Sequence, residues 1–298
     1  MSAFRAQLQA CGVPYLPLLE RKLWKPLRDI AVDGLVVLLA VAATRCWYWL
    51  APMAIVAIGN RQRALGNILH DAGHGNLHRS RRVNDAIARL LLAPLIFASL
   101  SHYRTTHFRH HLYLGDPLRD PDYLHPLESR VAGWRENYLR RVFVARNWWG
   151  SVAGHLGMGK LPIRSRIAIA AWWLGCMSLI TSVAGTGFVG CFLILWLVAR
   201  ATIFHLILTF REMCDHFGPV PFTRDILRRG LWTELIHPRN NGYHLTHHLL
   251  PAVPYYHLPA AQRLFSTLPA YYQSGRTFHS YLLGEGAVVV GWRTGSPA

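Results

Sequence analysis

The sequence predicts an all-α integral membrane protein, with four transmembrane helices in two hairpins and a cytoplasmic helical cap that holds a histidine-rich site. Three observations predict this class. Of the 298 residues, 52% are hydrophobic and only 16% are charged, whereas soluble domains carry roughly 25% charged residues. The long apolar runs come in two pairs. The remaining charges are strongly basic, with a formal net charge of +17, and many of the 17 histidines gather in clusters between the runs.

The first apolar region, residues 30–60, predicts a helical hairpin. A bilayer core of about 30 Å needs about 20 helical residues, so the region is too long for one span and slightly short for two. We therefore expect spans at 30–46 and 48–68, with the second helix continuing beyond the lipid to about His78. Arg45 and the aromatic residues at 47–49 would mark the far interface, where amphipathic rings settle.

The second hairpin is predicted at 167–183 and 188–210, joined by a glycine-containing turn. Residues 90–101 are also apolar, but they contain Pro94 and are too short to span, so they are expected to form an interfacial or re-entrant segment. The chain is read as one membrane domain covering residues 1–298.

The arginine distribution predicts the orientation of this domain. Two hairpins return the polar regions 1–29, 70–160 and 211–298 to one side, and nearly all of the arginines between the spans lie there. By the positive-inside rule this side is cytoplasmic. The N-terminal segment has no signal-peptide pattern, so no removal of a leader is expected. The basic charge is then explained by the membrane, and nucleic acid is not an expected partner.

Three histidine clusters fall at the predicted cytoplasmic ends of the helices. They are His70 and His74; His107, His110 and His111; and His244, His247 and His248. Helical spacings of three and four residues place the imidazoles of each cluster on one face. Eight such ligands exceed the three or four that one zinc ion needs, so we expect two metal ions. Imidazole suits several metals, and a double site beside lipid-facing helices favours redox chemistry and therefore iron.

These motifs resemble the histidine boxes of the membrane fatty-acid desaturase family. The similarity includes Gly115-Asp116-Pro117 after the second box and His247-His248-Leu249-Leu250-Pro251 at the third, as in bacterial members. The resemblance implies two iron ions, O2 as co-substrate and a ninth ligand between the fourth span and the third box, which maps onto His216. It also implies a bacterial cytoplasmic membrane, with the active site on the cytoplasmic side.

Other polar residues near the boxes are candidates for holding the ligands. Carboxylates commonly orient a metal-binding imidazole through its second nitrogen. The candidates are Asp71, Asp116, Asp120, Asp122, Asp215, Arg211 and Asn241. His205 is a weaker candidate for a ligand or substrate contact. Arg200 lies within the fourth span, so it is expected to reach the interface, pair inside the bundle or contact a polar substrate group.

The expected activity is O2-dependent desaturation of a fatty-acyl or related lipid substrate, and no catalytic side chain is expected beyond the metal ligands. A hydroxylase or ketolase on the same scaffold remains open, because the boxes do not define the product. A second alternative is a zinc intramembrane peptidase, with His70-Asp71-Ala72-Gly73-His74 as its zinc-binding motif. A third is a metal carrier, which would show no turnover. Substrate head group, double-bond position and oligomeric state are left open. Without a haem motif or clustered cysteines, the electrons would come from a separate ferredoxin or cytochrome.

Overall fold

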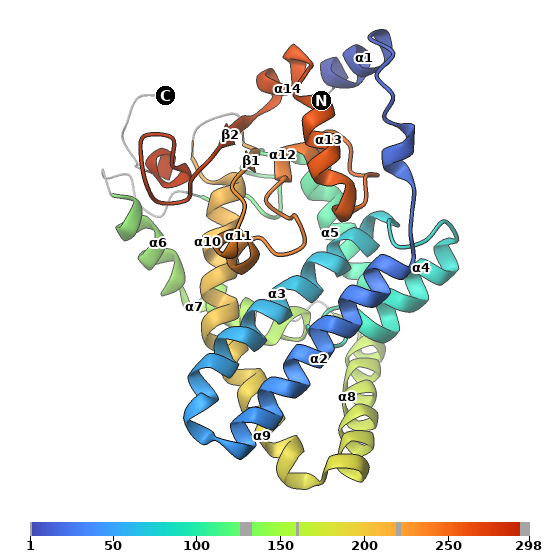
Figure 1. Ribbon diagram of the computed structural model, residues 1–298, viewed down its shortest axis with the longest axis vertical. Helices are drawn as coiled ribbons and strands as arrows, with labels where there is room; N and C mark the ends of the chain where they lie inside the picture. The colour runs from blue at the N-terminus through green and yellow to red at the C-terminus, as the bar shows by residue number, and fades with distance from the viewer. Residues whose placement is uncertain (1, 126–132, 159–160, 219–221, 293–298) are drawn as a thin grey trace.

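Two long helical hairpins and a cap of short helices make up the protein (Figure 1). The computed structural model describes residues 2–125, 133–158, 161–218 and 222–292. The helices of the two hairpins and of their continuation into the cap are α2 (Trp24–Cys46), α3 (Ala51–His74), α8 (Ile163–Ala184), α9 (Thr186–Ala199) and α10 (His205–His216). The remaining helices are α1 (Ser2–Ala10), α4 (Arg81–Ile87), α5 (Leu100–Tyr113), α6 (Trp134–Val142), α7 (Ala145–Ala153), α11 (Leu231–Ile236), α12 (His244–Leu249), α13 (Leu258–Phe265) and α14 (Pro269–Ser274). Strands β1 (Arg224–Ile226) and β2 (Arg276–Phe278) pair in parallel.

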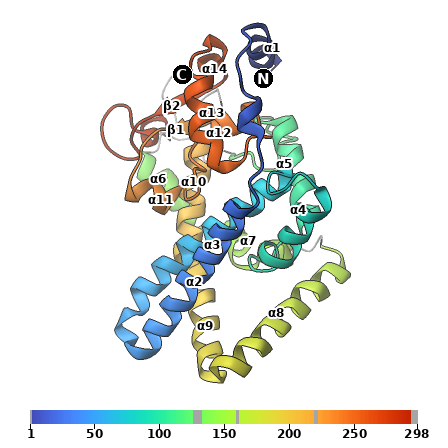
Figure 2. The same ribbon diagram turned by 45° about the vertical axis from the view of Figure 1, so that its right-hand side comes forward.

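Both hairpin turns lie at one end of the molecule, and the termini lie with α12–α14 and the strands at the other end (Figures 1 and 2). Helix α9 does not stop at Ala199. It passes through a π-helical segment, Arg200–Phe204, directly into α10. The result is one helix of 31 residues, Thr186–His216, that connects the turn end to the cap.

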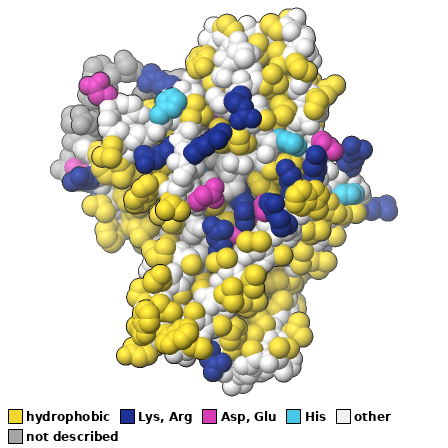
Figure 3. Space-filling view, viewed as in Figure 1, with side chains coloured by type: hydrophobic (Ala, Val, Ile, Leu, Met, Phe, Trp, Pro, Cys, Tyr) yellow, Lys and Arg dark blue, Asp and Glu magenta, His cyan; other side chains and the backbone are white. Residues whose placement is uncertain are grey.

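Among the described residues, two helices are long and apolar enough to cross a membrane, Ile163–Ala184 and Thr186–His216. Helix α8 packs mainly on α9 and stands away from the rest of the bundle (Figure 2). Its side chains include exposed Ile163, Leu174 and Val183. Figure 3 shows hydrophobic side chains over the turn end and Lys and Arg gathered nearer the cap. Exposed apolar surface of this extent is typical of membrane contact.

The first hairpin is less apolar than the second. Helices α2 and α3 fall outside the set of candidate spans, and a charged cluster lies between them and the cap. Asp33 of α2 pairs with Arg61 of α3 at 2.8 Å and with Arg239 of the cap at 2.6 Å. Asp29 accepts a hydrogen bond from the Tyr255 hydroxyl at 2.6 Å. These buried charges are therefore paired, and they join the hairpin firmly to the cap.

Several element boundaries differ from the sequence prediction. Helix α2 begins six residues before the expected span, and α3 begins after a 3-10 turn at Tyr48–Leu50. The expected continuation to His78 is wrong, because Gly75 adopts a φ of 81° and ends α3 at His74. A left-handed glycine is a common helix terminator. Residues 90–101, expected as an interfacial or re-entrant segment, contain the end of a π-helical segment, Ala88–Leu92, then turns and the start of α5.

Arg200 holds this non-spanning segment in place. Its Nε donates to the Val152 carbonyl at 2.7 Å, and its Nη2 donates to the Ile96 carbonyl at 3.0 Å. Its guanidinium also lies over the Phe97 ring, 5.1 Å from the centroid. Of the three expected roles, pairing inside the bundle describes these contacts, although the partners are backbone carbonyls and not a carboxylate.

Candidate metal centre

Four helices bring all nine predicted histidine ligands together at the junction between the hairpins and the cap. The ligand atoms form two groups, and within each group they all lie within 4.8 Å of one another. The larger group is His70, His74, His107, His111 and His247, and the smaller group is His110, His216, His244 and His248. Each group draws on at least two segments that are far apart in the sequence, so the folded cap is required to assemble it.

The imidazoles of each group point their Nε2 atoms at one another. In the larger group, His107 Nε2 lies 2.9 Å from His74 Nε2 and 3.0 Å from His111 Nε2. His247 Nε2 lies 3.1 Å from His111 Nε2. In the smaller group, His244 Nε2 lies 2.8 Å from His216 Nε2 and 3.1 Å from His248 Nε2. The rings of His111 and His248 stack with centroids 4.2 Å apart, which places the two groups side by side.

The groups fit metal ions better than they fit a hydrogen-bonded core. Burial and neighbouring imidazoles lower the pKa of His107, His247 and His248 far below the usual value. Burial, with Arg104, lowers the pKa of His74 to about 3. These rings are therefore neutral near pH 7, with a free electron pair available to a metal. Among the described residues, the buried His70 Nε2 has no hydrogen-bond partner, and a metal ion would satisfy it.

The second ring nitrogens of several histidines are fixed by protein groups. His110 Nδ1 donates to Asp120 at 2.8 Å, and His216 Nδ1 donates to the Phe222 carbonyl at 2.9 Å. Both bonds leave Nε2 of the ring for a metal. Hydrogen bonds of this kind set the tautomer and orientation of metal-binding histidines. Of the predicted carboxylates, Asp120 makes the direct contact, while Asp122 lies 3.9 Å from the same nitrogen.

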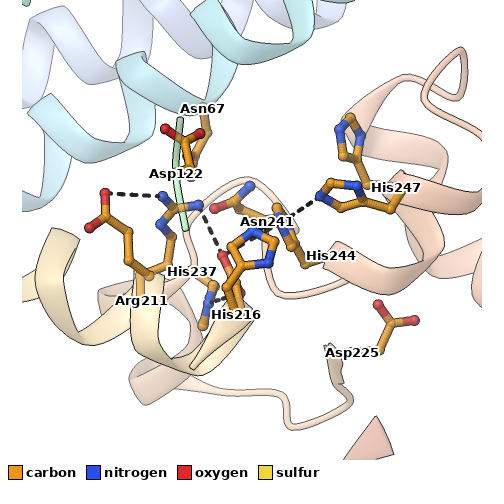
Figure 4. Close-up of polar contacts among 12 residues, drawn as sticks. Asn67, Asp122, Arg211, His216, Asp225, His237, Asn241, His244 and His247 are labelled. Atoms are coloured by element: carbon orange, nitrogen blue, oxygen red, sulfur yellow. Dashed lines mark hydrogen bonds and ion pairs between the residues drawn. The ribbon is translucent and has the colours of Figure 1, made fainter. Parts of the chain in front are cut away.

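Asp215 connects the smaller group to the charged surroundings. It accepts a hydrogen bond from His237 Nε2 at 3.1 Å and pairs with Arg211 Nη1 at 2.9 Å. Its other near neighbour is His244 Nδ1, at 3.8 Å. Figure 4 shows Arg211 and His216 on α10 facing His244 and His247 of the third cluster. Arg211 and Asp215 thus lie where the sequence predicted them, beside the ligands.

Other candidates have different partners. Asp71 accepts hydrogen bonds from Asn76 and from the Tyr255 backbone, and not from an imidazole. Asp116 accepts from the backbone N–H groups of Leu118 and Arg119. These two carboxylates stabilise loops, because they accept hydrogen bonds from N–H groups of the loop residues.

Asn241 and His205, both predicted to lie near the ligands or the substrate, have other partners in the structure. Asn241 contacts Arg63 through its amide oxygen at 3.4 Å. His205 is not available to a ligand or substrate, since Ser151 contacts its Nδ1 at 2.8 Å and the Val142 carbonyl contacts its Nε2 at 3.0 Å. Both nitrogens of His205 are therefore used to hold neighbouring helices together.

Asp225 is a supporting residue that the sequence did not reveal. It is fully buried on β1 and accepts hydrogen bonds from the Thr246 backbone at 3.0 Å and the Thr246 hydroxyl at 2.5 Å. Thr246 lies between His244 and His247 on α12, a helix of only six residues. Asp225 also accepts from the Tyr271 hydroxyl at 2.6 Å. It therefore holds the third cluster from the side away from the metal groups (Figure 4).

A chamber of about 330 Å³ opens beside both histidine groups. Its walls include His70 and His107 of the larger group and His110, His216 and His244 of the smaller group. The remaining lining combines apolar side chains, among them Ile96, Phe204 and Leu208, with five charged residues, Arg63, Asp122, Arg200, Arg211 and Glu212. A concave, partly apolar space with convergent polar groups is typical of a substrate site.

These features define an α-helical protein with candidate membrane helices and a histidine centre suited to two metal ions. The chain belongs to the fatty acid desaturase family, whose model matches residues 20–281. The relatives are named as desaturases, which makes this chain an oxidoreductase of desaturase type. The family assignment suggested by the histidine boxes is thus confirmed.

Three relatives illustrate the range of the similarity. Dihydrorhizobitoxine desaturase from Bradyrhizobium elkanii is 28% identical over 270 residues, covering 81% of this chain and 75% of the relative. The sn-1 oleoyl-lipid 12-desaturase of Anabaena variabilis is 24% identical over 260 residues, covering 75% and 73%. A chloroplastic sn-2 acyl-lipid omega-3 desaturase (ferredoxin) from Helianthus annuus is 26% identical over 305 residues, covering 88% and 67%. Their names differ in substrate, so similarity at this level does not extend to the substrate.

Proposed function

We propose that this protein is an O2-dependent di-iron desaturase that introduces a double bond into a fatty-acyl or related substrate at the cytoplasmic face of a membrane. The observation that carries the proposal is the sorting of nine buried or half-buried histidines into two groups whose ring nitrogens lie within 4.8 Å of one another. His70, His74, His107, His111 and His247 would hold one iron ion, and His110, His216, His244 and His248 the other. An iron pair bound there would supply the activation of O2 that removal of unactivated hydrogen requires.

The overall reaction balances with an external electron donor. A –CH2–CH2– unit, O2, two electrons and two protons give –CH=CH– and two molecules of water. The chain contributes position and exclusion of water: the chamber presents a substrate to both histidine groups at once. Holding reactants in a fixed orientation lowers the barrier substantially. Asp120 and the Phe222 carbonyl keep the imidazoles of His110 and His216 in the tautomer that ligation needs.

Product analysis tests this function directly. The protein is expressed in cells of defined lipid composition, and lipids and small metabolites are compared with those from a His110→Ala variant at matched expression. We expect a new alkene with the wild type and none with His110→Ala. His257→Ala is the matched control and should retain the product, since His257 lies outside both metal groups. An alcohol without an alkene would replace desaturation by hydroxylation.

A zinc peptidase fits the geometry less well. Its general base would be Asp71, whose oxygens accept hydrogen bonds from Asn76 and Tyr255. Metal analysis of the purified protein separates the two functions, since the desaturase predicts two iron ions per chain. One zinc ion and no iron would overturn the desaturase proposal.

We propose that both hairpins cross the membrane, giving four spans, and that the cap is cytoplasmic in a bacterial inner membrane. The charged groups of α2 and α3 are compatible with this because Asp33 pairs with Arg61 and Arg239, and intramembrane charges are tolerated when they pair inside the bundle. The chain offers natural probes: Cys46 is exposed at the end of α2, and Cys11 is exposed in the cap. In intact cells, an impermeant thiol reagent should label Cys46 and should label Cys11 only after permeabilisation. The reverse pattern would invert the orientation.

The electron donor is proposed to be a separate ferredoxin or cytochrome. A relative from Helianthus annuus carries ferredoxin in its name, and the strongly basic chain would attract an acidic carrier. Reconstitution with a reduced ferredoxin or a reduced cytochrome b5 should support turnover with one of them. Turnover with neither would reject both classes of donor.

A further inference from the structure

The chamber beside the histidines contains a buried arginine with no carboxylate partner. Arg63 of α3 lines the chamber and is only 8% exposed. Its Nη2 bonds to the amide oxygen of Asn67 and lies 3.4 Å from that of Asn241. Both partners are neutral. Within the described part of the chain, Arg63 forms no ion pair and its buried Nε has no hydrogen-bond partner.

Such an arrangement is costly unless an anion completes it. A buried charge without a counter-ion loses its hydration and gains little in return. Each of the other two arginines of the chamber also has one buried nitrogen without a partner, but Arg200 donates to two backbone carbonyls and Arg211 pairs with Asp215. Arg63 is therefore the cation that most needs a ligand. A guanidinium stays charged when buried and forms strong hydrogen bonds to carboxylate and phosphate oxygens.

The position of the Arg63 guanidinium limits how far an anion would lie from the histidines. Arg63 and His70 are seven residues apart on α3, so they share one face of the helix. The side chain extends toward His70, because a Cβ placed on Gly66 would lie 3.6 Å from Arg63 Nη1. The guanidinium thus lies at the height of residue 66 along the helix axis. His70 is four residues further along α3, which corresponds to a rise of about 6 Å.

The volume of the chamber supports a compact substrate. At about 330 Å³ it lies at the small end of the roughly 300–1,000 Å³ found for ligand pockets. Gly66 contributes to the space, since it lines the chamber beside the guanidinium and presents no side chain. A substrate with a charged group at Arg63 and its reacting carbons at the histidines fits this volume, whereas a lipid reacting near the middle of a long chain has no charge to offer at that distance.

We propose that Arg63 binds an oxyanion of the substrate, and that the protein desaturates a compact anionic molecule whose charge lies in the same chamber as the histidines. This inference rests on the proposed desaturase function and specifies its substrate class. The shared chemistry is a carboxylate or a phosphate monoester on a short alkyl chain. Asn67 and Asn241 fix the guanidinium through its Nη2, and its Nη1, beside Gly66 of the chamber wall, is the nitrogen offered to the ligand.

The test measures binding and does not require turnover. Hexanoate, hexyl phosphate, hexanol and hexylamine are titrated by calorimetry into the metal-containing full-length protein in detergent. Wild type should bind hexanoate or hexyl phosphate about ten- to a hundred-fold more tightly than hexanol, because hydrogen bonds between charged partners are strong. The better of the two anions identifies the head group. Arg63→Gln should remove the preference, and Arg63→Lys should restore part of it.

The control variant is Arg82→Gln, which removes an exposed arginine of α4 that does not line the chamber. It should bind the anions as the wild type does. Equal binding of hexanol and the anions by the wild type would overturn the proposal even if Arg63→Gln failed to fold. Unchanged anion binding by Arg63→Gln would also overturn it. If anions bind as expected but no alkene forms from any compound, the proposed function fails while the oxyanion site stands. If only long acyl lipids are desaturated, equally well by Arg63→Gln, the function stands and this inference fails.

Discussion

Replacing Asp120 with asparagine should weaken one of the two metal groups selectively. Asp120 Oδ1 accepts the His110 Nδ1–H bond at 2.8 Å, and its Oδ2 accepts from the Gly115 backbone at 2.9 Å. Burial opposes ionisation of this carboxyl, but the hydrogen bonds, first that from His110, outweigh it and lower the pKa of Asp120. An asparagine has one acceptor oxygen for these two donors, so its NH2 group must face either the imidazole or the loop.

The size of the effect follows from the role of that bond. Loss of a hydrogen bond behind a metal-binding histidine typically lowers metal affinity 10–100-fold, which corresponds to about 1.4–2.7 kcal/mol. His110 belongs to the smaller group of four. We therefore expect Asp120→Asn to lose the iron of this group first, so that chelator titration shows one iron released early and one retained, where the wild type releases both at higher chelator concentration.

Asp116→Asn is the matched control for this experiment. Asp116 lies in the same loop, and its carboxylate also accepts backbone hydrogen bonds, but it has no contact with an imidazole. Iron content after dialysis against a graded chelator series is the assay. If Asp120→Asn retains iron as well as Asp116→Asn does, the carboxylate does not act through His110 and the reasoning is refuted.

Three further outcomes are expected. His205→Phe should lower the free energy of unfolding by about 1–3 kcal/mol without changing iron content, because His205 bonds only protein groups; loss of iron would contradict this. Thr246→Val should cost a similar amount, since it removes a donor to buried Asp225; an unchanged melting temperature in detergent would argue against the role of Asp225. In the metal-free protein, the pKa of His74 is about 3, against about 6.5 when unfolded. The unfolded state then binds more protons, so the melting temperature should fall as the pH drops below 6.5, and a rise there would contradict the burial.

The gathering of the clustered histidines could be predicted because their spacing is local. In an α-helix, residues three or four apart share a face whatever the rest of the chain does, and this held on α3, α5 and α12. His216 was placed through family resemblance, and it joins the smaller group. The hairpins were predicted for a similar reason, since apolar runs of helical length identify them without reference to distant residues.

The groups that support the ligands depend on contacts between distant segments, and the sequence carries no signal for these. Asp225 bonds to Thr246, 21 positions away in the sequence. The conformation of the loop after α5 places Asp120, and not Asp116, against His110. Asp71 is adjacent to a ligand in sequence but faces Asn76, because the next residue on a helix points about 100° away. The ion pairs between Asp33 and the cap were likewise invisible, so the first hairpin looked more apolar than it is.

The π-helical segment at Arg200–Phe204 divides one continuous helix into two stretches, α9 and α10, whose faces are rotated relative to each other. Its wider turns offset the face presented by α10 from the face that α9 would dictate, and one residue more or fewer in a helix turns everything beyond it by about 100°. Exposed side chains of α9 can therefore change without turning His216 away from the centre. Loss of a single residue within the segment would instead leave a helix still long enough for the bilayer but with its histidine on the wrong side.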